Sequence, residues 1–335
     1  MTDELLFLSH AETLDLLSPA EAMAVCEDVY RMHADGTVSW TDPPAFRLDD
    51  DRFHHHWHVK GALLSEIPVS GVRLYAYYED AERSTVGTLD ATRYIVLSDP
   101  VTSAALAIVE EHWTYAIRST AAACLACKWM ANPDASVLGL VGVGTMGTTA
   151  LQCLKEMYDF AEIRCTSRRP ETRGAFADKW SAALGIPVTP ASSIEEVVRG
   201  ADIAVGGTTS KDIVSRADWL KPGATFVSLA RRELDPAGWP AMDKIVVDDF
   251  DINMLTPEFR KTVADGLFSR ETMHGEIADL VAGEAVGRER PDERNLIHTV
   301  GLVSHDIGVA HYVYKKALDI GAGLRLPLPH AMGRG

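Results

Sequence analysis

The sequence predicts an α/β protein of two domains, one of which holds a parallel sheet. The chain has 335 residues, and at roughly 150 residues per domain this length favours two domains over one. From about residue 135 onward, short apolar strands alternate with amphipathic helices of roughly 10 to 15 residues. This alternation is typical of a parallel sheet whose strands are joined by crossover helices.

Composition and charge restrict the class of partner. Hydrophobic residues make up 47% and charged residues 24% of the chain, which is ordinary for a globular protein and excludes disordered and fibrous classes. The formal net charge is −16, and such an excess repels phosphate backbones and anionic lipid. We therefore expect a small-molecule partner, and neither a nucleic acid nor a membrane.

The cysteines and the start of the chain predict a cytoplasmic location. Five Cys is an odd number scattered along a long chain, which argues against a disulfide framework. The opening residues lack the pattern of a signal peptide, and no apolar run is long enough to span a bilayer. Cys124 and Cys127 form a CxxC pair inside an alanine-rich, helix-like segment without a second pair at zinc spacing, so no metal site is predicted.

The first 118 residues mix helix and strand. Ser18 and Pro19 are typical of the start of a helix. Val69 to Tyr78 and Thr92 to Leu97 are rich in β-branched and aromatic residues, which favours strands in a mixed sheet.

Five further strands are predicted in the second part of the chain, and a long helix is predicted over Asn295 to Ala317, where the alternation stops. The strands are expected at Ser136 to Val141, Glu162 to Thr166, Asp202 to Gly206, Thr225 to Leu229 and Lys244 to Val247.

A glycine-rich turn carries the strongest functional signal. A strand runs directly into Gly142-Val143-Gly144-Thr145-Met146-Gly147 and then into a helix, the context that a Rossmann dinucleotide fingerprint requires. Gly142 permits the tight turn, Gly144 lets a pyrophosphate approach the backbone, and Gly147 allows close packing of helix and sheet. The helix start would then hold the phosphates. The alternative is a tight turn that binds no ligand.

The end of the next strand bears on the choice of cofactor. A site for NAD would place Asp or Glu there, whereas this chain has Ser167, Arg168 and Arg169. Arginines and hydroxyls suit a 2′-phosphate, so the sequence favours NADP(H) over NAD(H); stacking on adenine, or exposure to solvent, is the alternative for the arginines. Thr208 and Thr209 follow the strand predicted at Asp202 to Gly206, where they are expected to touch the ribose or the nicotinamide.

Several segments follow one another in a characteristic order along the chain. They are Trp113-Thr114-Tyr115-Ala116-Ile117-Arg118-Ser119-Thr120, the glycine turn, Ala201-Asp202-Ile203, Trp219-Leu220-Lys221-Pro222-Gly223-Ala224 and Gly301-Leu302-Val303-Ser304-His305-Asp306. Together these segments resemble the ornithine cyclodeaminase/μ-crystallin family, and their order makes the resemblance more specific than any single motif.

The resemblance implies a Rossmann doubly wound parallel sheet inserted into a mixed α+β domain. Residues 1–118 and 300–335 would form the substrate-binding and dimerisation domain, and residues 119–299 the dinucleotide-binding domain. It also implies a homodimer and redox chemistry at the carbon that bears an amino acid's nitrogen.

Two arginines match family residues that bind the substrate carboxylate. Arg118 is the first, and a guanidinium suits this task because it donates bidentately; a structural ion pair is the alternative. Arg47 is the second, with a solvated surface charge as its alternative.

Two departures from the family pattern affect the expected chemistry. Arg73 occupies the position of the family's usual lysine, and an arginine stays protonated and shuttles protons poorly. After Ala230 the chain proceeds directly to Arg231 and Arg232, and the aspartate important for cyclodeamination has no clear counterpart. Cyclisation of ornithine is therefore disfavoured, and hydride transfer to or from an imine or amino acid is expected.

A histidine-rich stretch offers a replacement proton donor. If residues 53–60 form a strand, then His54, His56, His58 and Lys60 share one face. Lys60 could supply the proton that Arg73 cannot, with His56 or His58 beside it as a group that titrates near neutral pH. A polar face at a wet dimer interface and a histidine metal site are the alternatives.

The sequence thus predicts an NAD(P)H-dependent oxidoreductase, an imine reductase or amino-acid dehydrogenase, that acts on an amino acid or its imine. Two other functions remain open. One is a redox-neutral cyclodeaminase that retains NAD tightly and releases ammonia from ornithine or lysine. The other is a nucleotide-binding protein without catalysis.

Overall fold

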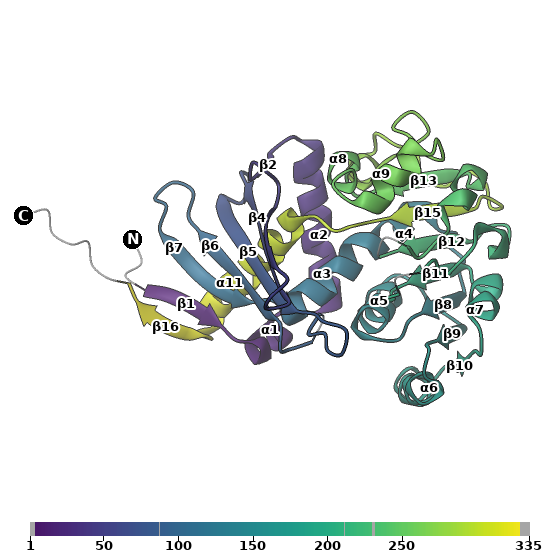
Figure 1. The fold of residues 1–335 in the computed structure, drawn as a ribbon, viewed down its shortest axis with the longest axis horizontal. Coiled ribbons are helices and arrows are strands. Elements are labelled where there is room, and N and C mark those ends of the chain that lie inside the picture. The colour runs from purple at the N-terminus through teal and green to yellow at the C-terminus, as the bar shows by residue number, and fades with distance from the viewer. Residues whose placement is uncertain (1–3, 87, 211, 230–231, 329–335) are drawn as a thin grey trace, which may run out of the picture. The chain divides into compact units, whose positions relative to one another are not determined.

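The chain forms two units, each built on its own eight-stranded sheet (Figure 1). The computed structural model describes residues 4–328 except 87, 211 and 230–231. Unit 1 consists of Met1–Arg118 and Val303–Gly335, and unit 2 of Ser119–Leu302. Unit 1 therefore joins two distant parts of the sequence, whereas unit 2 is one continuous stretch.

The sheet of unit 1 is mixed, as predicted. Its strand order is β16-β1-β7-β6-β5-β4-β2, and β3 also pairs with β4. β1 runs parallel to β7, and the remaining pairs are antiparallel. The strands are β1 (Glu4–Leu8), β2 (Val38–Trp40), β3 (Phe46–Asp50), β4 (His55–Leu64), β5 (Val69–Tyr78), β6 (Thr92–Ser98), β7 (Ala105–Glu110) and β16 (Leu324–Pro327).

Helices cover one face of this sheet. α2 begins with a capping box, because the Ser18 hydroxyl accepts from the Glu21 backbone N–H while the Glu21 carboxylate accepts from the Ser18 N–H. α11 packs against α2 and against strands β4, β5 and β6. The helices are α1 (His10–Leu16), α2 (Pro19–Ala34) and α11 (Val303–Ile320), together with α3 (His112–Leu125), which begins in unit 1 and ends in unit 2.

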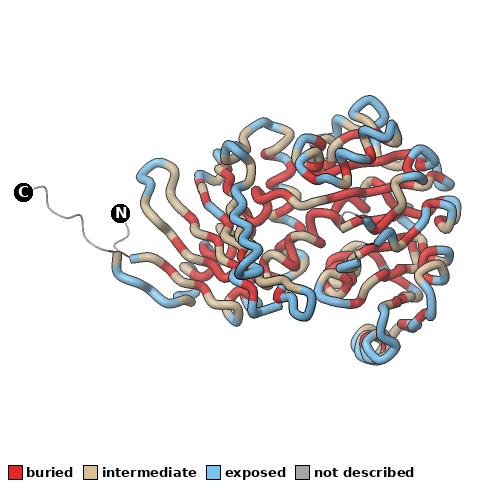
Figure 2. The backbone as a smooth tube through the Cα atoms, viewed as in Figure 1, coloured by how far each residue is buried: buried red, intermediate tan, exposed pale blue. Residues whose placement is uncertain are grey.

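Burial alternates along the strands of unit 1, which separates a covered face from an open one. In β6, Arg93, Ile95 and Leu97 are buried, whereas the residues between them are half-buried or exposed. Figure 2 shows the buried stretches of both sheets. Lys60 of β4 lies opposite Arg73 of β5 on the covered face.

Unit 2 is a doubly wound parallel sheet, which confirms the predicted Rossmann fold. The order is β10-β9-β8-β11-β12-β15-β13-β14, all parallel. The strand order reverses between β8 and β11, where ligands of such folds bind. The strands are β8 (Val137–Val141), β9 (Glu162–Thr166), β10 (Val188–Pro190), β11 (Ile203–Gly206), β12 (Thr225–Ser228), β13 (Lys244–Val247), β14 (Gly275–Glu276) and β15 (Asn295–His298).

The helices of unit 2 connect these strands. α5 packs against β8 and β11, α6 against β9 and β10, and α7 against β8 and β9. They are α4 (Cys127–Met130), α5 (Thr145–Lys155), α6 (Pro170–Leu184), α7 (Ile194–Gly200), α8 (Phe250–Asn253), α9 (Pro257–Ala264) and α10 (Ile277–Ala282), with 3-10 helices at Ala217–Trp219 and Pro236–Ala241.

The predicted long helix over Asn295 to Ala317 is wrong in its first part. Residues Asn295–His298 form β15, which lies between β12 and β13 in the sheet. Gly301 then adopts a positive φ of 84°, and the helix begins only at Val303. A short buried strand and a buried helical turn have the same apolar composition, so periodicity did not separate them.

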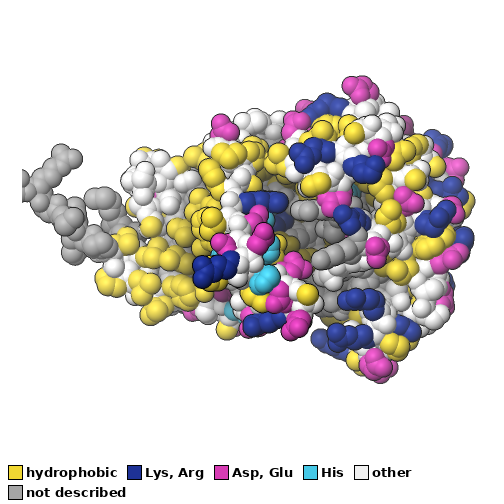
Figure 3. All heavy atoms as spheres, viewed as in Figure 1, with side chains coloured by type: hydrophobic (Ala, Val, Ile, Leu, Met, Phe, Trp, Pro, Cys, Tyr) yellow, Lys and Arg dark blue, Asp and Glu magenta, His cyan; other side chains and the backbone are white. Residues whose placement is uncertain are grey.

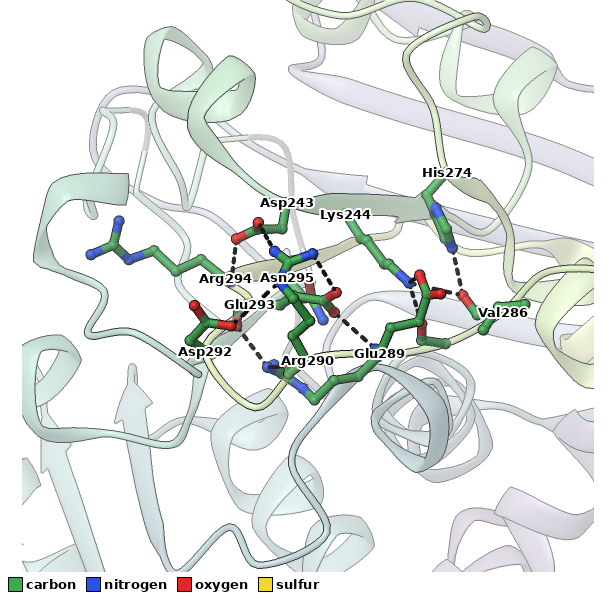
Figure 4. A network of polar contacts seen from close by, with 12 residues as sticks. Asp243, Lys244, His274, Val286, Glu289, Arg290, Asp292, Glu293, Arg294 and Asn295 are labelled. Atoms are coloured by element: carbon green, nitrogen blue, oxygen red, sulfur yellow. Dashed lines mark hydrogen bonds and ion pairs between the residues drawn. The ribbon is translucent and has the colours of Figure 1, made fainter.

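A polar network secures the amino-terminal edge of the sheet in unit 2 (Figure 4). Arg290 donates to the Asp243 carboxylate at 2.7 Å, and Lys244 contacts the carboxylate of Glu289 at 2.7 Å. This network ties the 286–294 loop to the start of β13. Ligands of parallel sheets bind at the opposite, carboxyl-terminal edge, so we assign the network a structural role. Among the described residues, no helix is long and apolar enough to cross a membrane.

Candidate functional site

A pocket of about 890 Å³ lies at the carboxyl ends of β8, β9 and β11 in unit 2. This is the topological switch point of the sheet. Of the predicted cofactor residues, Gly142, Gly144, Ser167, Arg168, Thr208 and Thr209 line it.

The predicted residues Thr145, Met146 and Gly147 form the start of α5 and do not line the pocket. Gly147 instead acts on packing, because a Cβ there would meet the Gly142 carbonyl oxygen at 2.0 Å. Gly142 has a φ of 98°, and its own Cβ would meet the Gly207 carbonyl oxygen at 2.5 Å. Neither position accepts a side chain without moving the backbone.

The basic residues after β9 occupy different environments. Arg168 lines the pocket, whereas Arg169 is the N-cap residue of α6 and does not. Sequence reasoning missed Arg173, which lines the pocket from the first turn of α6 and donates to the Ser167 carbonyl oxygen at 2.9 Å. It also missed Ser192 and Ser193, which follow β10.

Glu233 holds together two loops at the carboxyl-terminal edge of the sheet. Its carboxylate accepts from the Thr208 backbone N–H and from the Leu229 backbone N–H, each at 2.7 Å. Its side chain is buried, and bonds from backbone amides to a carboxylate are of the stronger, charge-assisted kind. Ala230 and Arg231, where the family's aspartate has no clear counterpart, lie outside the described residues.

The pocket suits a dinucleotide. Gly142 and Gly144 place no side chain at these two positions of the turn, and Gly144 has open space where a Cβ would stand. The backbone of the turn is thus accessible to a pyrophosphate at the start of α5. Arg168 and Arg173 add positive charge on the β9 side.

A second cluster of functional side chains lies in unit 1, where carboxylates and arginines are buried together. Arg118 Nε donates to Oδ1 of Asp306 at 2.6 Å. Arg73 Nε donates to both carboxylate oxygens of Glu111, at 2.9 and 2.7 Å, and lies 3.8 Å from Asp306 Oδ1. All four side chains are at most 9% exposed, so these ion pairs are formed in a low dielectric.

Arg73 keeps its charge in this surrounding. Burial disfavours the charged form of Arg73, but the Glu111 and Asp306 carboxylates raise its pKa above the ordinary value. Arg118 Nη1 is buried and has no hydrogen-bond partner among the described residues. An unpaired buried donor is costly, and a substrate carboxylate would satisfy it. The structural ion pair expected as the alternative role of Arg118 is therefore present, with Asp306 as its partner. It leaves the Nη1 donor of Arg118 available.

Lys60 lies beside this cluster as the cross-strand partner of Arg73. Burial, together with the charges of Arg73 and Arg118 and against the opposing charge of Asp306, lowers the pKa of its amine to about 8. No hydrogen bond or ion pair joins this amine to another residue in the part of the chain that the structure describes. An amine with this pKa changes its protonation near physiological pH.

The expectation that His58 titrates near neutral pH is wrong. Burial lowers its pKa to about 4, and the charge of Arg47 on β3 acts in the same direction. His58 is therefore neutral at pH 7. Its ring packs near those of Tyr75 and Tyr77 and forms an aromatic wall with them, with ring centroids 5.8 and 6.0 Å away. Arg47 lies opposite His58 on an exposed strand. His54 precedes β4 rather than sharing its face.

Sequence reasoning missed Glu111, Asp306, Arg93 and Tyr115. Three residues on α3 and just before it, Glu111, Tyr115 and Arg118, follow one another at spacings of four and three residues, which places them on one helical face. That spacing was an available signal. Asp306 is 188 residues from Arg118, and no local pattern links the two. No group of three metal-ligating side chains is found within the described ranges.

Comparisons with known proteins agree with this architecture. The ornithine cyclodeaminase/mu-crystallin family model matches residues 4–321. Alanine dehydrogenase of Archaeoglobus fulgidus is 28% identical over 331 residues, which cover 96% of this chain and 98% of that one.

Two solved structures resemble the whole chain. One is Delta(1)-pyrroline-2-carboxylate reductase of Thermococcus litoralis in complex with NADH and L-proline, with a TM-score of 0.87, 26% identity, and coverage of 96% of this chain and 100% of that one. The other is an archaeal alanine dehydrogenase dimer with bound NAD, with a TM-score of 0.85, 26% identity, and coverage of 96% and 99%. Because the family match extends over nearly the whole chain and confirms the resemblance found in the sequence, this protein belongs to the ornithine cyclodeaminase/mu-crystallin family.

Proposed function

We propose that this chain is an NAD(P)H-dependent oxidoreductase that transfers hydride between nicotinamide and the Cα of an amino acid or its imine. The observation that carries the proposal is the dinucleotide-sized pocket at the switch point of unit 2, lined by the glycine turn. The cofactor is a nicotinamide dinucleotide, as in the two similar structures with bound NADH and NAD. When bound, it supplies or accepts the hydride at C4 of its nicotinamide ring.

The arginines of unit 1 bind the substrate carboxylate in this proposal. Asp306 and Glu111 engage Arg118 and Arg73 through their Nε atoms. Nη1 of Arg118 is buried and has no hydrogen-bond partner among the described residues. Two fixed guanidinium groups orient a carboxylate, and orientation alone contributes roughly 7 to 11 kcal/mol to lowering a bimolecular barrier. Arg47, exposed on β3, is a further candidate for this task.

Lys60 is the proposed proton donor. Lys60 lies on β4 directly opposite Arg73 of β5. The neighbouring strand thus supplies an amine next to the position where the family usually has its lysine. In imine reduction the protonated amine gives its proton to the substrate nitrogen as hydride reaches Cα, which yields a neutral lysine and the amino acid. His58 forms an aromatic wall and carries no proton at neutral pH in this scheme.

We propose NADP(H) as the preferred cofactor. Arg168 and Arg173 line the β9 side of the pocket, beside Ser167 and Ser192. Guanidinium groups recognise phosphate bidentately, and none of the pocket-lining residues that directly follow β9 or β10 is a carboxylate. Arg169 has no part in this proposal because it does not line the pocket.

We also propose a homodimer located in the cytoplasm. One similar structure is a dimer. The open face of the sheet in unit 1 carries Phe46, Leu48 and Val72, which are 48%, 58% and 41% exposed, and Figure 3 shows hydrophobic side chains over these strands. Such a face favours burial against a second copy. Leu48→Glu should therefore shift the mass measured by light scattering to that of a monomer.

Absorbance at the reduced-nicotinamide band tests the function. NADPH and NADH are each mixed with keto acids plus ammonia or methylamine, and with preformed cyclic imines. Oxidation of the cofactor that depends on the substrate supports the proposal. Release of ammonia from ornithine or lysine without net change in absorbance would establish a cyclodeaminase instead. Tight nucleotide binding in calorimetry without any turnover would establish a binding protein.

A further inference from the structure

The buried cluster of unit 1 holds more positive than negative groups. Three arginines and one lysine gather there against two carboxylates. The cations are Arg73, Arg93, Arg118 and Lys60, and the anions are Glu111 and Asp306. Because charges in a low dielectric interact strongly, an excess of buried cations is unfavourable until an anion joins them.

One tyrosine ring lies at the centre of the three guanidinium groups. The Cζ atoms of Arg93, Arg73 and Arg118 lie 4.3, 4.8 and 5.0 Å from the centroid of Tyr115. Arg93 is also 3.9 Å from the centroid of Tyr75, so it stacks between two aromatic rings. Cation–π contacts hold the guanidinium groups in place but supply no negative charge.

The carboxylates of the chain engage only part of these groups. Glu111 binds Arg73 through Nε and reaches Arg93 Nη1 only at 3.4 Å. Asp306 binds Arg118 through Nε. Burial also raises the pKa of Glu111, against the opposing charges of Arg73 and Arg93, and any protonation of Glu111 would enlarge the cationic excess.

Other charges close in sequence do not balance the cluster. Asp49 on β3 pairs with His56 at 2.9 Å and lies on the same face of the strand as Arg47, so that face adds no net negative charge, and Asp50 lies on the opposite face. Glu110 contacts His10 and His112. The remaining requirement is for about two negative charges.

We propose that the substrate is an amino or imino acid with a second carboxylate, and that Arg93 determines this specificity. The proposal rests on the function given above and adds the class of substrate. Arg118 and Arg73 hold the carboxylate on Cα, and Arg93 holds the carboxylate of the side chain. A dicarboxylate balances the charge of the cluster, whereas a monocarboxylate leaves part of it unpaired.

Matched pairs of keto acids test the class of substrate. With ammonia and NADPH, oxaloacetate is compared with 2-oxobutyrate, and 2-oxoglutarate with 2-oxovalerate, so that chain length is held close. A charge-assisted hydrogen bond contributes about 1.5 to 3 kcal/mol, so kcat/KM for the dicarboxylate should be higher by roughly 10- to 150-fold. Equal values, or a preference for the monocarboxylates, would overturn the proposal.

Two variants test Arg93. Arg93→Gln should lower the ratio of dicarboxylate to monocarboxylate kcat/KM at least about tenfold, and Arg93→Lys should restore part of it. Arg31→Gln, on the exposed surface of α2, is the matched control and should leave the ratio unchanged. An equal loss for both classes in Arg93→Gln would show that Arg93 only supports Glu111, and would overturn its role.

A binding measurement separates this proposal from the function itself. Calorimetry of the NADP⁺-loaded enzyme with succinate and with butyrate requires no turnover. Tighter binding of succinate supports the substrate class even if no keto acid is reduced. If monocarboxylic imines are turned over and succinate does not bind more tightly than butyrate, the proposed oxidoreductase function stands. The proposed dicarboxylate substrate class is then contradicted.

Discussion

Arg118 Nε donates to Oδ1 of Asp306 at 2.6 Å, although the residues are 188 positions apart in the chain. This bond fixes one edge of the guanidinium group, while Nη1 remains buried without a partner among the described residues. Arg118→Ala should therefore abolish turnover while the dissociation constant of the cofactor stays nearly unchanged, measured by NADPH fluorescence titration. Unchanged substrate kinetics would show that Arg118 does not bind the carboxylate.

Asp306 positions Arg118 rather than contacting substrate. In Asp306→Asn the guanidinium loses its charged partner, so KM should rise more than kcat falls, and Asp306→Glu should recover part of the loss. Breaking a buried ion pair also costs about 3 to 5 kcal/mol of stability, which thermal unfolding will report. A fall in kcat at constant KM would contradict the positioning role.

Lys60 should set the alkaline limb of the pH profile. Its pKa of about 8 means that the donor is protonated below that pH and is lost as pH rises through it. For imine reduction kcat/KM should accordingly fall above about pH 8. Lys60→Met should remove this limb and lower the rate by roughly 10²- to 10⁴-fold. An unchanged limb in the variant would assign it to another group.

Gly147→Ala should eliminate nucleotide binding. The new Cβ would lie 2.0 Å from the Gly142 carbonyl oxygen, so the turn must move away from the helix start. Gly174→Ala is the matched control, since it lies within α6 with nothing within 4 Å of the added atom. Gly174→Ala should stabilise the protein by about 0.5 to 1 kcal/mol. Calorimetry with NADP⁺ and thermal unfolding compare the two variants.

Glu233→Ala should weaken cofactor binding by roughly 10-fold, as expected for the loss of charge-assisted hydrogen bonds. The variant leaves the Thr208 and Leu229 backbone N–H groups without their carboxylate, so the loops beside the pocket lose their common anchor. Glu289→Gln, whose side chain is 60% exposed and belongs to the network at the opposite sheet edge, should leave the dissociation constant unchanged. Equal dissociation constants of the cofactor in wild type and Glu233→Ala would exclude the anchoring role of Glu233.

His298 should make stability depend on pH. It is 3% exposed, and burial lowers its pKa from 6.5 to about 4. Above pH 6.5 both states are neutral and the full stability is present. As pH falls from 6.5 toward 4, the unfolded chain binds the proton first and stability is lost, by about 2 kcal/mol at pH 5. Urea unfolding above pH 6.5 and at pH 5 should show a smaller loss of unfolding free energy in His298→Gln than in the wild type.

The glycine turn could be predicted because its signal is local. Strand, turn and helix follow one another within a short stretch around Gly142, and Gly142 and Gly147 each stand where an added Cβ would meet the backbone. The parallel sheet of unit 2 followed from the alternation of strands and helices in the same way. Asn295–His298 was misread because a run of four residues with two apolar side chains does not distinguish a strand from a helical turn, although Gly301 marks the break between strand and helix.

The chemistry of unit 1 was harder to predict because it depends on contacts across the sheet. The register that places Lys60 opposite Arg73 follows from the pairing of β4 and β5, which spacing within one strand does not show. Asp306 comes from a helix near the other end of the sequence. The lowered pKa of His58 arises from burial, a property of the folded chain that residue type alone does not carry.

The pairing of β1 with β16, and the packing of α11 against β4 and β5, also affect how the protein is made. During synthesis the whole of unit 2 leaves the ribosome before Val303 does. Unit 2 can therefore fold before α11, the last helix of unit 1, has been released. Until then the strands of unit 1 have no α11 against them, and Arg118 has no Asp306. Chaperones that shield exposed strands should consequently act on nascent chains that end between β7 and α11.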